Sequence, residues 1–159
     1  MGFLMIDIRE LALFRGFQPG QLDLLESMFM TDHAQAGTVL FKQGDPAHYL
    51  YVLLEGEVHL YYKPEDESEI TLAKIKPEGI VGWSAALGNP EYTSSAVCMM
   101  DCQMLRIHGQ DLRRLCELYP KTGSVVLDRL AAMVADRWHG KHPNVMALLE
   151  HGIHTHPGS

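Results

Sequence analysis

The first thirty residues carry apolar positions at helical spacing, with one interruption. Leu11, Leu13 and Phe14 follow Asp7, a residue type that caps helices well. The segment "GFQPG" (16–20) breaks the pattern, and apolar residues resume at near-helical spacing up to Met30. We therefore expect N-terminal helices within residues 7–30.

After Gly37 the pattern changes to short apolar runs separated by Gly, Pro and Asp. The runs at 38–41, 49–54, 58–62, 70–75, 94–99 and 103–107 predict β-strands. Turns are expected at 43–46 and 55–56, and the acidic segment 63–69 is expected to be a solvated hairpin tip. Strands of about five residues, with turn signals about every 8 to 12 residues, are typical of a sandwich or jelly roll.

Helical patterns return near the end of the chain. Residues 109–119 predict a short amphipathic helix before Pro120, and residues 121–138 predict a longer helix. The apolar stripe of the longer helix consists of Leu127, Leu130, Val134 and Trp138. This stripe could pack on its own β-roll or on the same helix of a second copy, which would make a homodimer.

The order of these elements predicts an α+β fold. We expect an antiparallel β-roll (a double-stranded jelly roll) of about eight strands, flanked by N- and C-terminal helices. The predicted domain covers residues 1–138, with N-terminal helices in 7–30, the β-roll in 31–107 and C-terminal helices in 109–138. Residues 139–159 form a tail with five histidines, which we interpret as incidental solvated sequence rather than a metal site.

Composition narrows the function classes. The chain has 159 residues, which suits one domain with a sizeable core. Its formal charge of −7 disfavours nucleic acid and anionic membranes as partners. No apolar run reaches the roughly 18 residues of a membrane span, and the acidic start is unlike a signal peptide. Three cysteines without paired spacing indicate unbridged thiols, so we expect a cytoplasmic protein.

The segment "GIVGWSAALGNPEYTSSAV" (79–97) has the features of an anion cradle. A helix start leaves backbone N–H groups unpaired, and its dipole adds partial positive charge. Gly82 permits close approach of a phosphate, and Ser84 could donate a hydrogen bond from its hydroxyl. The small side chains of Ala85 and Ala86 leave room for a ligand to lie over the helix. However, no Lys or Arg occurs between Lys76 and Arg106.

Three further stretches make the chain resemble a cyclic-nucleotide-binding domain of the catabolite activator and kinase regulatory-subunit superfamily. Residues 36–61 resemble the opening strands of that family, 81–87 the start of its phosphate-binding cassette, and 93–107 the two strands after it. The matching positions in the opening strands are Gly37, Phe41, Gly44, Asp45, Tyr51, Leu54 and Gly56. The resemblance covers roughly residues 8–138. It implies a bacterial-type sensory or regulatory domain in which ligand at the cassette moves the C-terminal helix.

The chain departs from the family at two ligand contacts. In the family a Glu after the cassette glycine holds the ribose 2′-hydroxyl, and an Arg further on pairs with the cyclic phosphate. Here Trp83 and Tyr92 stand at those positions, and the neighbouring Glu91 carries a negative charge, which would repel a phosphate. Because charge-assisted hydrogen bonds contribute about 1.5–3 kcal/mol each, we expect cAMP binding to be weak or absent.

The candidate ligand-binding residues are Gly82, Trp83, Ser84, Ala85, Ala86, Tyr92, Thr93 and Ser94. Three interpretations of them stay open: the two aromatic residues only pack the cassette, the pocket is retuned for another small anionic ligand, or it still binds a cyclic nucleotide. The sequence names no cofactor and no catalytic residue.

Other functions find less support in the sequence. A cupin-like metal enzyme would need a histidine pair in the barrel, but His48, His59 and His108 are isolated along the chain. The 21 residues after Trp138 are too few for a DNA-binding helix-turn-helix module. We therefore predict a stand-alone, non-catalytic sensory or regulatory domain, with a ligand-independent interaction or dimerisation module as the alternative.

Overall fold

The computed structural model describes residues 11–138, with side chains as far as Met133. The predicted tail 139–159, the expected Asp7 cap and the side chains of Val134 and Trp138 lie outside this part of the chain. A 3₁₀ turn, η2 (Ala12–Phe14), comes first and is followed by helix α1 (Pro19–Met28). The helices α2 (Trp83–Leu87), α3 (Gly109–Leu118) and α4 (Pro120–Trp138) come later in the chain.

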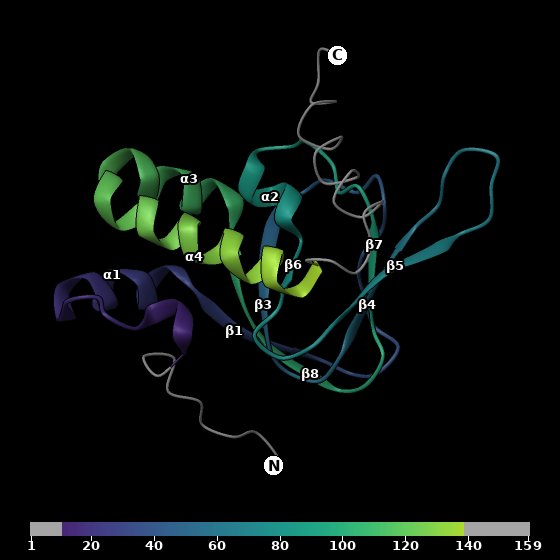
Figure 1. Ribbon diagram of the computed structural model, residues 1–159, viewed down its shortest axis with the longest axis horizontal. Helices are drawn as coiled ribbons and strands as arrows, with labels where there is room; N and C mark the ends of the chain where they lie inside the picture. Colours follow the sequence, from purple (N-terminus) through teal and green to yellow (C-terminus); the bar gives the residue numbers. More distant parts are fainter. Residues whose placement is uncertain (1–10, 139–159) are drawn as a thin grey trace.

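Within residues 11–138, eight strands form two antiparallel four-stranded sheets (Figure 1). One sheet has the order β1 (Met30–Ala34), β8 (Cys102–His108), β3 (Tyr49–Glu55) and β6 (Ile80–Val81). The other has the order β2 (Val39–Phe41), β7 (Ser95–Cys98), β4 (Val58–Tyr62) and β5 (Ile70–Ile75). The predicted antiparallel β-roll with helical ends is confirmed.

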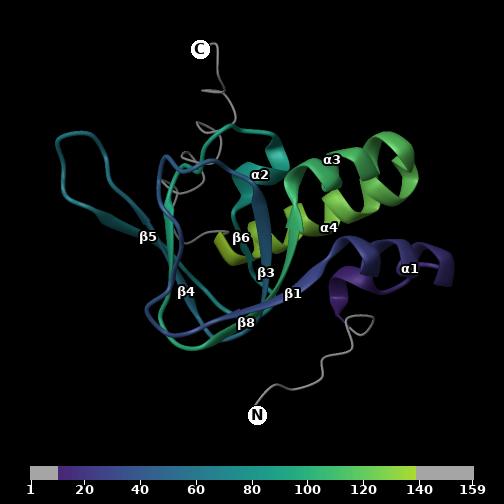
Figure 2. The same cartoon turned by 180° about the vertical axis from the view of Figure 1, so that it is seen from behind.

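Two apolar clusters lie on opposite faces of the first sheet. Successive side chains of a strand point to opposite faces, and on β8 Met104 belongs to the cluster between the sheets whereas Leu105 and Ile107 belong to the helix-side cluster. Figure 2 shows α1, α3 and α4 gathered on the side of β1, β3 and β8. Leu130 of α4 is fully buried in the helix-side cluster and Leu127 packs against it, so this part of the predicted stripe packs on its own chain.

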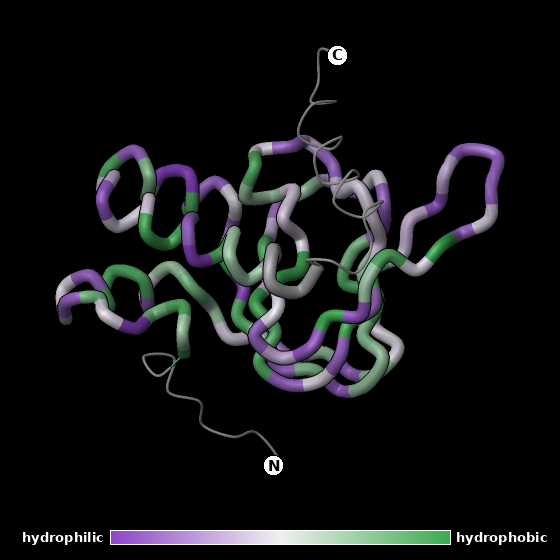
Figure 3. Tube along the Cα trace, in the orientation of Figure 1, coloured by the Kyte–Doolittle hydropathy of each residue, from purple (hydrophilic) through white to green (hydrophobic). Residues whose placement is uncertain are grey.

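Some element boundaries differ from the prediction. The N-terminal helix ends at Met28, and residues predicted as its last turn and the following loop form β1, which pairs with β8 from Met30↔Arg106 to Ala34↔Cys102. Pro120 begins α4 instead of preceding it, because a proline at the first helical position loses no helical hydrogen bond. Strands β4 and β5 have the predicted bounds, and the hydrophilic loop between them projects from the body (Figure 3).

Within residues 11–138 no helix combines the length and apolar character required to span a membrane. The same part of the chain contains no cluster of three or more His, Cys, Asp or Glu arranged to hold a metal ion.

Candidate functional site

Helix α2 lies between two glycines in the left-handed region of backbone conformation. Gly82 precedes it with φ of 87° and Gly88 follows it with φ of 79°. A Cβ at Gly82 would lie 2.7 Å from the carbonyl oxygen of Tyr49, so glycine is required by both angle and space. Ser84, Ala85 and Ala86 are buried, so only part of this short helix can face a ligand.

Tyr92 fills the space beside Gly82. Its ring carbon lies 3.3 Å from the place that a Cβ on Gly82 would take, and its ring stacks on Phe41 with centroids 3.6 Å apart. Its hydroxyl donates to the carbonyl oxygen of Tyr49 at 2.6 Å and accepts from the backbone N–H of Tyr49 at 2.9 Å. With 5% of its surface exposed, Tyr92 belongs to the core between the sheets.

The surroundings of Tyr92 keep its hydroxyl uncharged. Burial raises the pKa of Tyr92, and burial followed by the proximity of Tyr92 raises the pKa of Tyr51 to about 12. Both hydroxyls therefore stay protonated near neutral pH, and the ring of Tyr92 brings no positive charge to the start of α2.

The other predicted residues divide between the core and the surface. Trp83 is half-buried and packs against the helix-side cluster. Thr93 is exposed and Ser94 is half-buried, at the start of the segment leading into β7. Glu91 is exposed and forms an isolated β-bridge with Pro46, so the repulsion that an inward-facing Glu91 would add is not expected.

Neither of the two arginines most relevant to the cradle reaches it. The guanidinium of Arg106 lies 4.6 Å from the ring centroid of Tyr49 and 3.8 Å from a carboxylate oxygen of Asp32. Arg129 donates to backbone carbonyls near η2, including that of Leu13 at 3.1 Å.

Arg113 does reach α2, a contact that the sequence analysis missed. Its guanidinium donates to the carbonyl oxygen of Ala85 at 2.7 Å. This carbonyl belongs to the C-terminal half of α2, where the helix dipole favours positive charge. Donor and acceptor are 28 positions apart in the sequence, so no local sequence signal predicts the contact.

Helix α2 is connected to the C-terminal helices through close backbone contacts. A Cβ at Gly109, the first residue of α3, would collide with the carbonyl group of Ala85. A Cβ at Gly123 of α4 would lie 2.6 Å from the Cα of Cys116 of α3. The three helices therefore pack in series with little space between their backbones.

Comparison with known proteins gives a consistent family assignment. A family model described as cyclic nucleotide-binding domain matches residues 31–119. The cyclic AMP receptor protein of Thermus thermophilus is 32% identical over 125 residues, which are 79% of this chain and 56% of that protein. The crystal structure of a candidate cyclic nucleotide-binding protein from Geobacter metallireducens has a TM-score of 0.72 and 30% identity, covering 83% of this chain and 96% of that one.

Similar sequence also occurs inside much longer proteins. The patatin-like phospholipase domain-containing protein 6 of Homo sapiens is 32% identical over 113 residues, which are 70% of this chain and 8% of that protein. The chain thus spans little more than half of the Thermus relative and a small part of the human one.

Proposed function

Because the chain belongs to the cyclic nucleotide-binding domain family, we propose that it is a non-catalytic regulatory domain in which Tyr92 occupies the anion cradle and cyclic nucleotides bind weakly. The observation that carries this proposal is the placement of Tyr92, whose ring lies beside Gly82 and whose hydroxyl is held by both backbone groups of Tyr49.

Two energetic terms oppose a cyclic phosphate at this site. The first is the missing charge, since each charge-assisted hydrogen bond that the family's Arg would supply contributes about 1.5–3 kcal/mol, or roughly tenfold to a hundredfold in affinity. The second is the displacement of Tyr92, which would leave the N–H and C=O of Tyr49 unpaired at a further cost of about 1–3 kcal/mol. Both terms weaken binding, so we expect the dissociation constant for cAMP to lie well above the micromolar range.

The proposed regulatory connection runs from the cassette to the C-terminal helices. Residues 82–87 and 92–95 form the first part of this switch and helix 121–138, now α4, the last. The contacts of Ala85 with Gly109 and Arg113 link α2 to α3, which packs along α4. A partner or ligand that prefers one position of α4 would shift the equilibrium only by its differential affinity.

We place the domain in the cytoplasm, as a unit of residues 1–138 followed by the tail 139–159. The three free cysteines, Cys98, Cys102 and Cys116, support a reducing compartment.

A ligand-independent interaction module is the second candidate. Leu118, Tyr119 and Val125 are 64%, 50% and 39% exposed around the junction of α3 and α4. Apolar side chains grouped on a surface favour a protein partner, for which a second copy pairing through helix 121–138 is one form. A thermal-shift screen of nucleotides and metabolites separates the candidates, because a sensor gains stability from its ligand and a scaffold does not.

Calorimetric titration with cAMP and cGMP tests the main proposal. The native protein should show no saturable binding up to about 100 µM ligand. The double variant Trp83→Glu, Tyr92→Arg should gain measurable affinity, whereas Trp83→Glu alone should not, because Tyr92 still fills the cradle. Micromolar binding by the native protein would overturn the proposal.

A further inference from the structure

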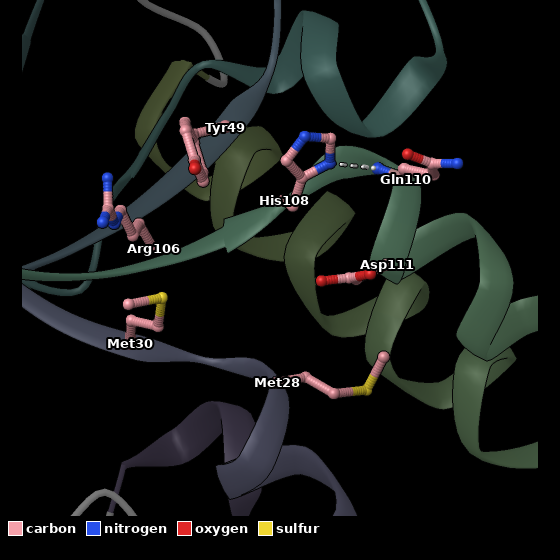
Figure 4. A pocket seen from close by; sticks show the side chains of 7 residues that line it. All are labelled: Met28, Met30, Tyr49, Arg106, His108, Gln110 and Asp111. Carbon is pink, nitrogen blue, oxygen red and sulfur yellow. Dashed lines mark hydrogen bonds between the residues drawn. The ribbon is translucent and has the colours of Figure 1, made fainter.

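A cavity lies away from the cassette, where α1, β1, β3, β8 and α3 meet. It has a volume of about 240 Å³ and is lined by Met28, Met30, Tyr49, Arg106, His108, Gln110 and Asp111 (Figure 4). This volume is slightly below the range of about 300–1,000 Å³ typical of drug-sized ligand sites, so it suits a smaller metabolite. Of its lining residues, only Tyr49 also takes part in the cassette, through its backbone.

Arg106 supplies a positively charged guanidinium to the lining of this cavity. Its Nε is buried and, within the described part of the chain, has no hydrogen-bond partner. The Asp32 carboxylate is 3.8 Å away, too far for a good hydrogen bond, and one face of the guanidinium lies on the Tyr49 ring. The planar guanidinium is suited to a carboxylate, which it can bind with two parallel hydrogen bonds.

Asp111 supplies the opposite charge on another wall. It lies in the first turn of α3, and Figure 4 shows it across the cavity from Arg106. With Asp32 beside Arg106 and Asp111 on the other wall, a simple anion would meet net negative charge, and a simple cation would gain nothing from the Arg106 guanidinium. A ligand with one carboxylate and one ammonium group matches both walls.

The walls between these charges are apolar or aromatic. Met28 and Met30 line one side of the cavity in Figure 4, and the rings of Tyr49 and His108 line the other. Thioethers make favourable contacts with aromatic rings, and Met30 is 54% exposed, so a ligand there would cover apolar surface. His108 keeps its orientation because its Nδ1 accepts the backbone N–H of Gln110 at 3.1 Å.

We propose that this cavity binds a small zwitterion with an apolar or aromatic side chain, of the size of a free amino acid. Arg106 holds the carboxylate, Asp111 holds the ammonium, and the side chain lies against Met28 and Met30. The site is independent of the cassette and stands whether or not cyclic nucleotides bind there.

L-phenylalanine is the probe, titrated into the full chain by calorimetry up to about 10 mM. The expected result is saturable binding, with backbone amide shifts in NMR spectra centred on residues 106–111. 2-Phenylethylamine lacks the carboxylate and 3-phenylpropionate lacks the ammonium, so each should bind at least about tenfold more weakly. A half-ligand that binds as well as L-phenylalanine refutes the zwitterion assignment, and no saturable binding of any probe refutes the site.

Two substitutions with matched controls locate the binding. Arg106→Gln and Asp111→Asn should each weaken L-phenylalanine binding about tenfold to a hundredfold. Arg114→Gln and Asp128→Asn make the same charge changes at exposed positions outside the cavity and should leave binding unchanged. Circular dichroism checks that all four variants are folded; unchanged affinity in both cavity variants, or shifts centred on residues 82–86, would overturn the proposal.

Discussion

Substitution of Tyr92 by phenylalanine tests whether its hydroxyl anchors the ring in the cradle. The change keeps the stack on Phe41 and removes the two hydrogen bonds to the backbone of Tyr49, at 2.6 and 2.9 Å. Tyr49 is half-buried, so water can reach its backbone groups only in part. An unsatisfied polar group of this kind costs about 1–3 kcal/mol.

For a chain of this size, 1 kcal/mol shifts the melting temperature by about 2–4 °C, so Tyr92→Phe should lower it by about 2 to 12 °C. Differential scanning calorimetry measures the shift, and amide hydrogen exchange should show faster exchange at Tyr49. Tyr61→Phe is the control, because Tyr61 is half-buried and its hydroxyl makes only long contacts, at 3.5 Å to His59 Nδ1 and 3.9 Å to Met99 Sδ. If Tyr92→Phe melts within about 1 °C of both native protein and control, the anchor does not exist.

Three further predictions concern stability. Gly82→Ala should destabilise the fold by about 1–3 kcal/mol in chemical denaturation, and by more than Gly88→Ala, whose added methyl would meet only a flexible side chain at 3.6 Å. The hydrogen bond from Lys76 lowers the pKa of Glu57 from 4.5 to about 2. The stability that Glu57 contributes is therefore present above pH 4.5 and is lost as pH falls toward 2. The Glu57→Gln variant should not show this loss of stability when unfolding is measured over the same acid range. Burial raises the pKa of Tyr51 from 10 to about 12. The stability that Tyr51 contributes is therefore present below pH 10 and is lost as pH rises toward 12. A Tyr51→Phe variant that loses stability as steeply as the native protein over that range would contradict this assignment.

Much of the fold could be predicted because its strands are apolar, short and separated by turn residues. Strands β4 and β5 match their expected ranges, and the acidic hairpin tip lies between them. Strand β1 was missed because "MTDHA" contains no alternating apolar pattern, and all five of its residues are exposed or half-buried. Strand β6 has two residues, too few to show any period.

The sequence indicates candidate positions for the site but not their contacts. The absence of an arginine at Tyr92 and the need for glycine at 82 follow from the sequence and the family pattern. The contact of the Tyr92 hydroxyl with the backbone of Tyr49 does not, because 43 residues separate them and any strand can offer backbone groups. The ligand roles of all eight candidate residues, Gly82, Trp83, Ser84, Ala85, Ala86, Tyr92, Thr93 and Ser94, stay predictions.

The close contact between Gly109 and the backbone of Ala85 limits which residues this domain can accept at position 109. A Cβ at residue 109 would lie 2.2 Å from the carbonyl oxygen of Ala85, so a larger residue does not fit there unless α2 moves. The exposed hairpin 63–69 can accept many substitutions. Position 109 accepts only glycine as long as α2 keeps its place. A side chain at residue 109 would therefore displace α2 from α3.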